Sequence, residues 1–242
     1  MPEPIEFENI HLSRGETVLF KGLDLSLPGG VTSALLGESG AGKSSLLELI
    51  NGLLLPASGE VRVFGQPVGE SELTGLRRRI GYAVQGTGLF PHLDIAANIA
   101  LVAKIIGWPD ARMDNRIKEL MELMALPEEL AQRYPHELSG GQQQRAGICR
   151  AMMVAPPILL LDEPFSGIDP VNRRDIHRRL SALVQAQGTT VVLVTHDSRE
   201  ALQLAANLVV LKAGRVIAAG PPETLLRLDD SYVRDLFEQP DA

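Results

Sequence analysis

The order of apolar and polar residues predicts an alternation of strands and helices along the chain. Mostly apolar runs of strand length lie at 31–36, 80–84, 158–161 and 191–195. The four consecutive apolar residues at 158–161 are typical of a parallel strand buried on both faces. Apolar residues recur at helical spacing over 44–54, 94–108 and 110–126. Pro109 and Pro127 end the last two of these stretches. The pattern therefore predicts an α/β fold with a helical region between its strands.

A glycine-rich segment joins the run at 31–36 to the helix that begins at 44. It reads Gly37, Glu38, Ser39, Gly40, Ala41, Gly42, Lys43, Ser44 and Ser45, and it contains the pattern G-x-x-x-x-G-K-[ST]. The glycines let successive backbone N–H groups turn inward toward phosphate oxygens, and the helix start adds a positive dipole end. The segment is therefore predicted to bind the phosphates of a nucleoside triphosphate, with the Lys43 ammonium on the β- and γ-phosphates and the Ser44 hydroxyl on Mg²⁺.

Two adjacent carboxylates follow the buried run at 158–161. Asp162 fits an acid on the metal side of the site, acting through a water on Mg²⁺. Glu163 fits the base that orients and deprotonates the attacking water. Taken alone, such a pair is more often a helix cap or a solvated turn, and only its combination with the glycine-rich segment favours catalysis.

A second phosphate-binding peptide covers residues 138–145 and reads LSGGQQQR. It resembles the signature motif of ATP-binding cassette (ABC) ATPases. Other positions match the family in its own order: Gln85 matches the Q-loop, residues 166–169 the D-loop, and His196 the switch histidine. The D-loop departs from the family, since glycine and isoleucine replace the usual alanine and leucine at 167 and 168. The implied fold is α/β, a P-loop NTPase (RecA-like) core with an N-terminal antiparallel β subdomain and an inserted α-helical subdomain.

The resemblance implies that the nucleotide site is shared by two copies of the chain. Free N–H groups at the helix start formed by Ser139, Gly140, Gly141 and Gln142 would grip the γ-phosphate held by the opposite subunit. His196 would contact the γ-phosphate within its own subunit, and Gln85 would approach Mg²⁺ and the attacking water. Asp169 would couple the two sites of a homodimer that ATP closes.

The residue expected to contact the base differs from the one usual in the family. Alignment of residues 5–10 with the family's first strand puts Arg14 where most members carry an aromatic residue that stacks on adenine. A guanidinium plane can stack on a purine, but an arginine at this position can equally point to solvent. The sequence leaves both alternatives open, and with them the preference for ATP over GTP.

We expect one nucleotide-binding domain over residues 1–242, with a core formed by 1–85 and 156–242 and a helical subdomain at 86–155. No CBS regulatory domain is expected. In the family, a groove between core and insertion receives a helix of a transmembrane permease subunit, and residues 88–92 (GLFPH) would line it. Met121, Met124 and the single cysteine, Cys149, are predicted to be packing residues.

Composition limits the partners. The net charge of −7 argues against nucleic acid. No apolar run reaches the roughly 18–20 residues that cross a bilayer, and Met1–Pro4 does not begin a signal peptide. We therefore expect a cytoplasmic subunit, peripheral on the inner face of the cell membrane, with membrane domains on separate chains.

Three segments outside the universal motifs, at 88–92, 104–108 and 133–137, look most like ATPases of osmoprotectant importers for glycine betaine, carnitine or choline. The resemblance thus implies the ATP-hydrolysing subunit of an importer that also works with a solute-binding protein. An ATPase of an exporter or lipid-transport system is the alternative. Two other classes, a non-transport ABC protein of DNA repair or translation and a regulatory module without turnover, fit the sequence less well.

Overall fold

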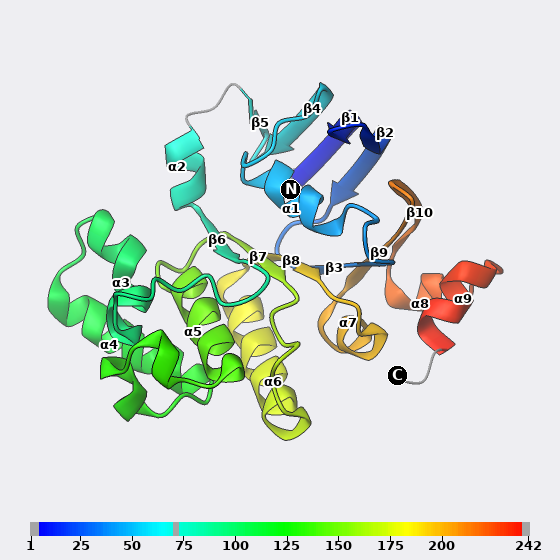
Figure 1. The fold of residues 1–242 in the computed structure, drawn as a ribbon. Coiled ribbons are helices and arrows are strands. Elements are labelled where there is room, and N and C mark those ends of the chain that lie inside the picture. Colours follow the sequence, from blue (N-terminus) through cyan, green and yellow to red (C-terminus); the bar gives the residue numbers. More distant parts are fainter. Residues whose placement is uncertain (1–4, 70–72, 239–242) are drawn as a thin grey trace. The chain divides into compact units, whose positions relative to one another are not determined.

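The computed structural model describes residues 5–69 and 73–238 (Figure 1). Met1–Pro4, on which the prediction about a signal peptide rested, lie outside the described residues. The chain forms two compact units, one made of 1–77 and 188–242 and the other of 78–187. The helical subdomain that we expect at 86–155 falls within the second unit, and its bounds stay a prediction.

The first unit begins with an antiparallel sheet. Its strand order is β2-β1-β4-β5, formed by β1 (Ile5–Arg14), β2 (Thr17–Leu27), β4 (Ser58–Val63) and β5 (Gln66–Pro67). Buried apolar residues recur along β1 and β2, and Phe7 and Phe20 are almost completely enclosed. This sheet confirms the predicted N-terminal antiparallel β subdomain.

The same unit contains a row of strands in the order β10-β9-β3-β8, namely β3 (Thr32–Gly37), β8 (Thr190–Val194), β9 (Asn207–Lys212) and β10 (Arg215–Gly220). β3 runs parallel to β8 and β9, and β10 pairs antiparallel with β9. All residues of β8 are buried, as the continuous apolar run predicts. Because Leu35 pairs with Val194, the carboxyl ends of β3 and β8 lie side by side.

Short helices follow these strands: α1 (Lys43–Ile50), α2 (Leu73–Arg78), α7 (Ser198–Leu204), α8 (Pro222–Leu225) and α9 (Ser231–Glu238). The predicted helix at 44–54 ends early, at Ile50. The Arg77 guanidinium donates hydrogen bonds to the carbonyls of Asn51 (3.0 Å) and Gly52 (2.7 Å), just beyond the helix end. Gly52 adopts φ 67°, a left-handed conformation that terminates helices.

The second unit contains two parallel strands, β6 (Ile80–Ala83) and β7 (Ile158–Asp162), against which α5 (Gly140–Met152) packs. The other helices are α3 (Ile95–Ile105), α4 (Asp110–Leu123), η1 (Glu128–Gln132), η2 (Pro135–Glu137) and α6 (Pro170–Gln187). The predicted packing roles of Met121, Met124 and Cys149 are confirmed, since none of these side chains is more than 1% exposed.

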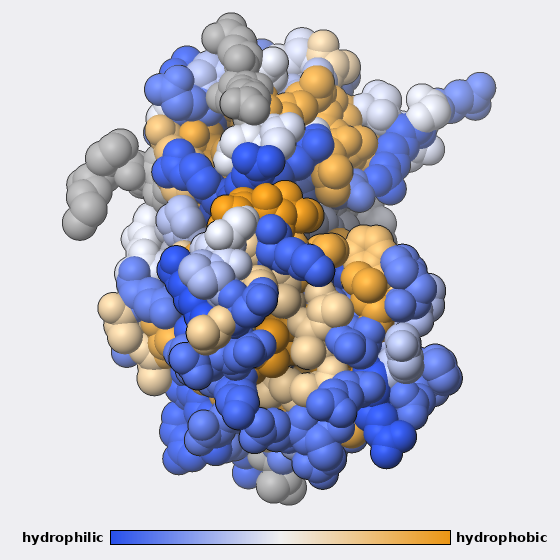
Figure 2. All heavy atoms as spheres, turned by 90° about the vertical axis from the view of Figure 1, so that its left-hand side faces the viewer, coloured by the Kyte–Doolittle hydropathy of each residue, from blue (hydrophilic) through white to orange (hydrophobic). Residues whose placement is uncertain are grey.

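Figure 2 presents the face on which α3 and α4 lie, where apolar side chains interrupt a mostly hydrophilic surface. The exposed apolar residues of the second unit include Phe90, Ile105 and Ile106. Among the described helices, none is both long enough and apolar enough to cross a bilayer.

Candidate nucleotide site

The glycine-rich segment forms a tight loop between β3 and α1. Gly37, Gly40 and Gly42 all have positive φ angles, of 144°, 80° and 98°. A Cβ at Gly42 would lie 2.5 Å from the ring of Phe20, and one at Gly37 would lie 2.1 Å from the carbonyl oxygen of Leu211. Two of the motif's glycines are therefore required by close packing as well as by conformation.

Lys43 is the first residue of α1, and its side chain folds back along the loop. Its Nζ donates hydrogen bonds to the carbonyl oxygens of Gly37 (2.7 Å) and Glu38 (2.8 Å). The residue is only 8% exposed, whereas Glu38, Ser39 and Gly40 are exposed. The ammonium group is thus held inside the loop that the motif assigns to phosphates. Ser44 and Ser45 follow it in the first turn of α1.

His196 follows β8, the strand that pairs with β3. The Thr195 N–H donates to the carbonyl of Leu35 (3.4 Å), which extends the pairing up to the residue before His196. His196 itself is exposed. Asp197 then caps α7, because its Oδ1 accepts from the N–H groups of Arg199 (2.9 Å) and Glu200 (3.0 Å). The first unit thus places the glycine-rich loop and His196 after neighbouring parallel strands.

Arg14 ends β1 and forms an ion pair with Glu48 of α1. Its Nη2 lies 2.6 Å from Oε2 of Glu48, and 58% of the Arg14 side chain remains exposed. The guanidinium is therefore tied to the helix that starts at the phosphate loop, a contact that the sequence did not predict. Whether the guanidinium stacks on a base stays a prediction.

In the second unit, three of the predicted site residues lie at or just after the carboxyl ends of β6 and β7. Ala83 pairs with Leu161, so that Gln85 and the Asp162–Glu163 pair emerge at the same edge. The Gln85 Nε2 donates to Oε2 of Glu163 (3.3 Å), and Asp162 is 3% exposed. Glu163 has φ 47°, which costs about 1–2 kcal/mol for a residue with a Cβ. Backbone strain at this position accords with a functional residue.

The signature peptide starts α5 with a capping box. Ser139 Oγ accepts from the Gln142 N–H (3.3 Å), and Gln142 Oε1 accepts from the Ser139 N–H (2.9 Å). The reciprocal pair fixes the helix start, and Gly140 lies exposed directly after the cap. An exposed N-terminus of a helix of 13 residues is suited to an anion.

Gln144, two residues further along α5, is a site residue that sequence reasoning missed. Its Nε2 donates to the Glu163 carbonyl (2.7 Å) and to Ser166 Oγ (3.1 Å), and its Oε1 accepts from the Gly167 N–H (3.1 Å). A Cβ at Gly141 would lie 2.4 Å from the Gly167 carbonyl oxygen, so α5 and the D-loop are in close contact. The only signal in the sequence was the run of three glutamines within the motif.

Asp169 lies at the start of α6, and its carboxylate contacts Asn172 of that helix. Its Oδ1 accepts from the Asn172 N–H (3.0 Å) and its Oδ2 from the Asn172 side-chain amide (2.7 Å). These contacts are those of an N-cap, so in this chain Asp169 stabilises the helix that follows the D-loop.

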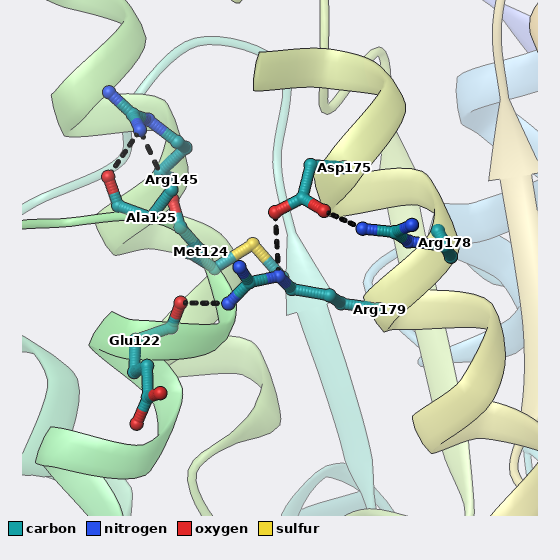
Figure 3. A network of polar contacts seen from close by, with 7 residues as sticks. All are labelled: Glu122, Met124, Ala125, Arg145, Asp175, Arg178 and Arg179. Atoms are coloured by element: carbon teal, nitrogen blue, oxygen red, sulfur yellow. Dashed lines mark hydrogen bonds and ion pairs between the residues drawn. The ribbon is translucent and has the colours of Figure 1, made fainter. Parts of the chain in front are cut away.

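Arginine side chains connect the end of α4 to α5 and α6 (Figure 3). Arg145 Nη1 donates to the carbonyls of Met124 (3.1 Å) and Ala125 (2.7 Å), and Arg179 Nη1 donates to the carbonyl of Glu122 (3.0 Å). The bonds from Arg145 satisfy two carbonyls just beyond the end of α4, and the bond from Arg179 adds to the one that the Glu122 carbonyl accepts from the Ala125 N–H (3.1 Å). They fix the helix that carries the signature peptide against the helical region.

The segment 88–92 is held by two side chains. Asn98 accepts from the Phe90 N–H (2.7 Å) and donates to its carbonyl (3.1 Å), and Arg150 donates to the Gly88 carbonyl (2.7 Å). The Arg150 guanidinium also lies 5.8 Å from the centre of the Phe90 ring, and Phe90 remains 42% exposed. An exposed aromatic residue on a fixed loop is suited to contact a partner.

The sequence model of the ABC transporter family matches residues 20–166. The chain belongs to the ABC transporter family. It is 45% identical over 234 residues to the ATP-binding protein of a glycine betaine uptake system of Escherichia coli, an alignment that covers 96% of this chain and 76% of that protein. A glycine betaine/carnitine/choline transport ATP-binding protein of Bacillus subtilis is 42% identical over 205 residues, or 85% of this chain. The chain spans about half the length of that relative, 54%.

Solved ABC transporter cassettes have the same fold. A dimeric ATP-binding cassette in a post-hydrolysis state, bound to ADP and phosphate, matches with a TM-score of 0.84 at 32% identity. The match covers 90% of this chain and 98% of that one. The predicted fold class and family are therefore confirmed.

Proposed function

We propose that the chain is the ATP-hydrolysing subunit of an ABC importer that moves a quaternary-amine osmoprotectant through separate membrane subunits. The observation that carries the proposal is the 45% identity, over 96% of the chain, to the ATP-binding protein of a glycine betaine uptake system. The local chemistry of both units supports it, since each carries groups suited to bind or cleave a nucleoside triphosphate.

ATP binds with its phosphates in the loop 37–45. Backbone N–H groups of the glycine-rich turn and the N-terminus of α1 supply the anion-binding dipoles. Lys43, held between the carbonyls of Gly37 and Glu38, already lies inside the loop, and its ammonium group binds the β- and γ-phosphates. Arg14, tied to Glu48, offers its exposed guanidinium plane to the base.

Mg²⁺ fits the donors that the chain offers. Ser44, Gln85 and Asp162 supply hydroxyl, amide and carboxylate oxygens, the hard ligands that Mg²⁺ takes alongside phosphates and water. Asp162 is almost fully buried at the end of β7, and it would act on Mg²⁺ through a water, since a nearby cation favours the charged form of a buried carboxylate. When bound, the ion neutralises charge that develops on the phosphoryl oxygens.

Glu163 accepts the proton of the attacking water. The Gln85 amide, in contact with a carboxylate oxygen of Glu163, orients that carboxylate and the water, and Gln144 fixes the Glu163 backbone. The imidazole of His196 contacts the γ-phosphate, where a donor stabilises the charge of the transition state.

The site is completed by a second copy of the chain. The capped start of α5, residues 139–142, contacts the γ-phosphate held by the other subunit, and Asp169 couples the two sites. A two-fold homodimer gives both nucleotides the same environment. A similar fold in a solved dimeric cassette supports this arrangement.

The remaining partners are transmembrane permease subunits and, through them, a solute-binding protein. The exposed Phe90 loop, which belongs to the helical subdomain proposed at 86–155, receives the permease, which places the subunit on the inner face of the cell membrane. The core then comprises 1–85 and 156–242. An exporter or lipid-transport ATPase is the alternative, and stimulation of the reconstituted complex by glycine betaine, carnitine or choline distinguishes the two.

Phosphate release tests the enzymatic part of the proposal. The purified chain with Mg²⁺ and ATP should release phosphate with a specific activity that rises with protein concentration, because the active species is a dimer. Lys43→Ala should abolish the release, whereas Lys21→Ala, which removes an exposed lysine of the same unit, should not. Turnover unaffected by Lys43→Ala would contradict the proposal.

A further inference from the structure

The C-terminal helix α9, red in Figure 1, packs against the strands of the first unit. Val233 is 1% exposed and belongs to a buried cluster with Leu36 of β3 and Val210 of β9. The ring of Tyr232 packs against the same cluster, and α9 also contacts α7, the helix after His196. A helix far from the phosphate loop in sequence is therefore fixed beside the strand that leads into it.

The Tyr232 hydroxyl reaches the phosphate loop itself. It accepts a hydrogen bond from the Glu38 N–H (3.2 Å) and donates one to the carbonyl of Leu211 (3.4 Å). Burial raises the pKa of the Tyr232 phenol, so the group stays protonated at neutral pH and can fill both roles. The Lys212 ammonium lies 4.2 Å from the centre of the ring and helps to fix its orientation.

Leu211 and Gly37 form the other side of this contact. The two residues pair in the parallel register of β9 and β3. Gly37 has φ 144°, and a Cβ there would lie 2.1 Å from the Leu211 carbonyl oxygen, the same oxygen that accepts from Tyr232. The hydroxyl thus links the end of β9 to the first peptide of the loop.

That peptide group is held from two directions. The carbonyl of Gly37 accepts from Lys43 Nζ (2.7 Å), and the N–H of Glu38, in the same peptide plane, donates to Tyr232. A rotation of this plane would move the acceptor of the Lys43 ammonium. The position of Lys43 therefore depends on a hydroxyl from the C-terminal helix.

We propose that Tyr232 is a positioning residue for nucleotide binding, which acts by holding the Gly37–Glu38 peptide and, through it, Lys43. The proposal rests on the proposed function, because it assigns a role in the same phosphate site. The hydroxyl acts through the backbone of the loop, so its effect is on the affinity for ATP and not on the chemical step.

Tyr232→Phe tests the proposal, since it removes the hydroxyl but keeps the ring in its packing and under Lys212. We expect the Kd for Mg²⁺-ATP, measured by titration calorimetry, to rise about three- to tenfold. The value of kcat at saturating ATP should change by less than about twofold. The substitution weakens binding of the ground state and of the transition state equally, so the barrier between them is unchanged. Without nucleotide, hydrogen exchange of the peptide that carries Glu38 should become several-fold faster.

Two controls separate positioning from general stability. Arg234, like Tyr232, lies on α9, and Arg234→Ala removes its exposed ion pair with Asp229. Tyr134→Phe removes the hydroxyl of an exposed tyrosine in the other unit. Both should leave the Kd and the exchange of the Glu38 peptide unchanged. A merely structural role of Tyr232 would lower Tm without changing either quantity.

The experiment distinguishes failure of the role given to Tyr232 from failure of the proposed function. If the unaltered chain does not bind ATP, both proposals are wrong. If it binds ATP and Tyr232→Phe binds it equally well, or if the exchange of the Glu38 peptide is unchanged, the role of Tyr232 is wrong and the proposed function stands.

Discussion

The side-chain amide of Gln85 donates a hydrogen bond to a carboxylate oxygen of Glu163 at 3.3 Å, and the two residues arrive from neighbouring parallel strands. A donor at this distance restrains one of the two carboxylate oxygens. The second oxygen is then oriented for the water whose proton Glu163 accepts. Gln85 thus has a measurable role through Glu163, in addition to any contact with Mg²⁺.

Gln85→Ala should lower kcat for ATP hydrolysis by at least about tenfold, because the base loses the group that orients it. The Kd for ATP measured without Mg²⁺ should be unchanged, since the phosphate loop is unaltered. Steady-state phosphate release and titration calorimetry measure the two quantities. Gln132→Ala, at an exposed glutamine of the same unit, is the control. A kcat within about twofold of the unaltered chain would show that the contact has no catalytic consequence.

Gln144→Leu should lower the free energy of unfolding by about 2 kcal/mol and also reduce hydrolysis. The substitution removes the buried amide that contacts the Glu163 carbonyl and the Gly167 N–H. The Glu163 carbonyl still accepts from Ser166 Oγ (3.2 Å), whereas the Gly167 N–H loses its side-chain acceptor at a cost of about 1–3 kcal/mol. Urea denaturation gives the first quantity and phosphate release the second. Gln143→Ala, which removes a bond to the Leu138 carbonyl only, should have a smaller effect on both.

The sequence predicted best those elements whose signal is local. Buried parallel strands appear as continuous apolar runs, so β3, β6, β7 and β8 were found within a residue or two of their ends. The glycine-rich loop was found because the spacing of its residues is itself the requirement of phosphate binding. The N-caps Asp94 and Ser139 lie where the predicted helices begin.

The rest depended on contacts between residues far apart in the chain. α1 ends at Ile50, and the Arg77 guanidinium that caps the Gly52 carbonyl comes from 25 residues further on. The contact of Arg14 with Glu48 spans 34 residues and that of Tyr232 with Glu38 spans 194. No periodicity or motif encodes such pairs, since they arise only when the sheet register brings the elements together.

Arg145→Met should lower the free energy of unfolding by about 2–3 kcal/mol, because a partly buried guanidinium no longer donates to the Met124 and Ala125 carbonyls. Arg178→Met is the matched control. Arg178 pairs with Asp175 but its side chain is 80% exposed, and exposed ion pairs contribute about 0–1 kcal/mol. Equal losses for the two variants in urea denaturation would contradict the role given to Arg145.

The thiol of Cys149 should make stability depend on pH in the alkaline range. Its Sγ donates to the Leu120 carbonyl, and burial raises the pKa of the thiol from 9.0 to about 12. The unfolded chain therefore releases this proton near pH 9 and the folded chain only near pH 12. The contribution of the protonated thiol is fully present below pH 9 and is lost as pH rises from 9 toward about 12.

Comparison with Cys149→Ala isolates this contribution. The difference in free energy of unfolding between the two proteins should shrink between about pH 8 and about pH 10.5. In the same pH range the native thiol should react slowly with iodoacetamide, because the thiolate is the nucleophile. A difference in stability that stays constant with pH would show that the thiol ionises equally in both states.

The central claim is that two copies of the chain close on ATP and that Glu163 then removes the proton of the attacking water. Glu163→Gln tests it most directly, because the amide keeps the shape of the side chain but cannot accept that proton. Light scattering with size-exclusion chromatography in Mg²⁺-ATP, together with phosphate release, is the measurement. We predict a stable dimer that retains uncleaved ATP, with hydrolysis reduced by about 10²–10⁴-fold. Hydrolysis at the rate of the unaltered chain, or a protein that remains monomeric at saturating ATP, would contradict the account.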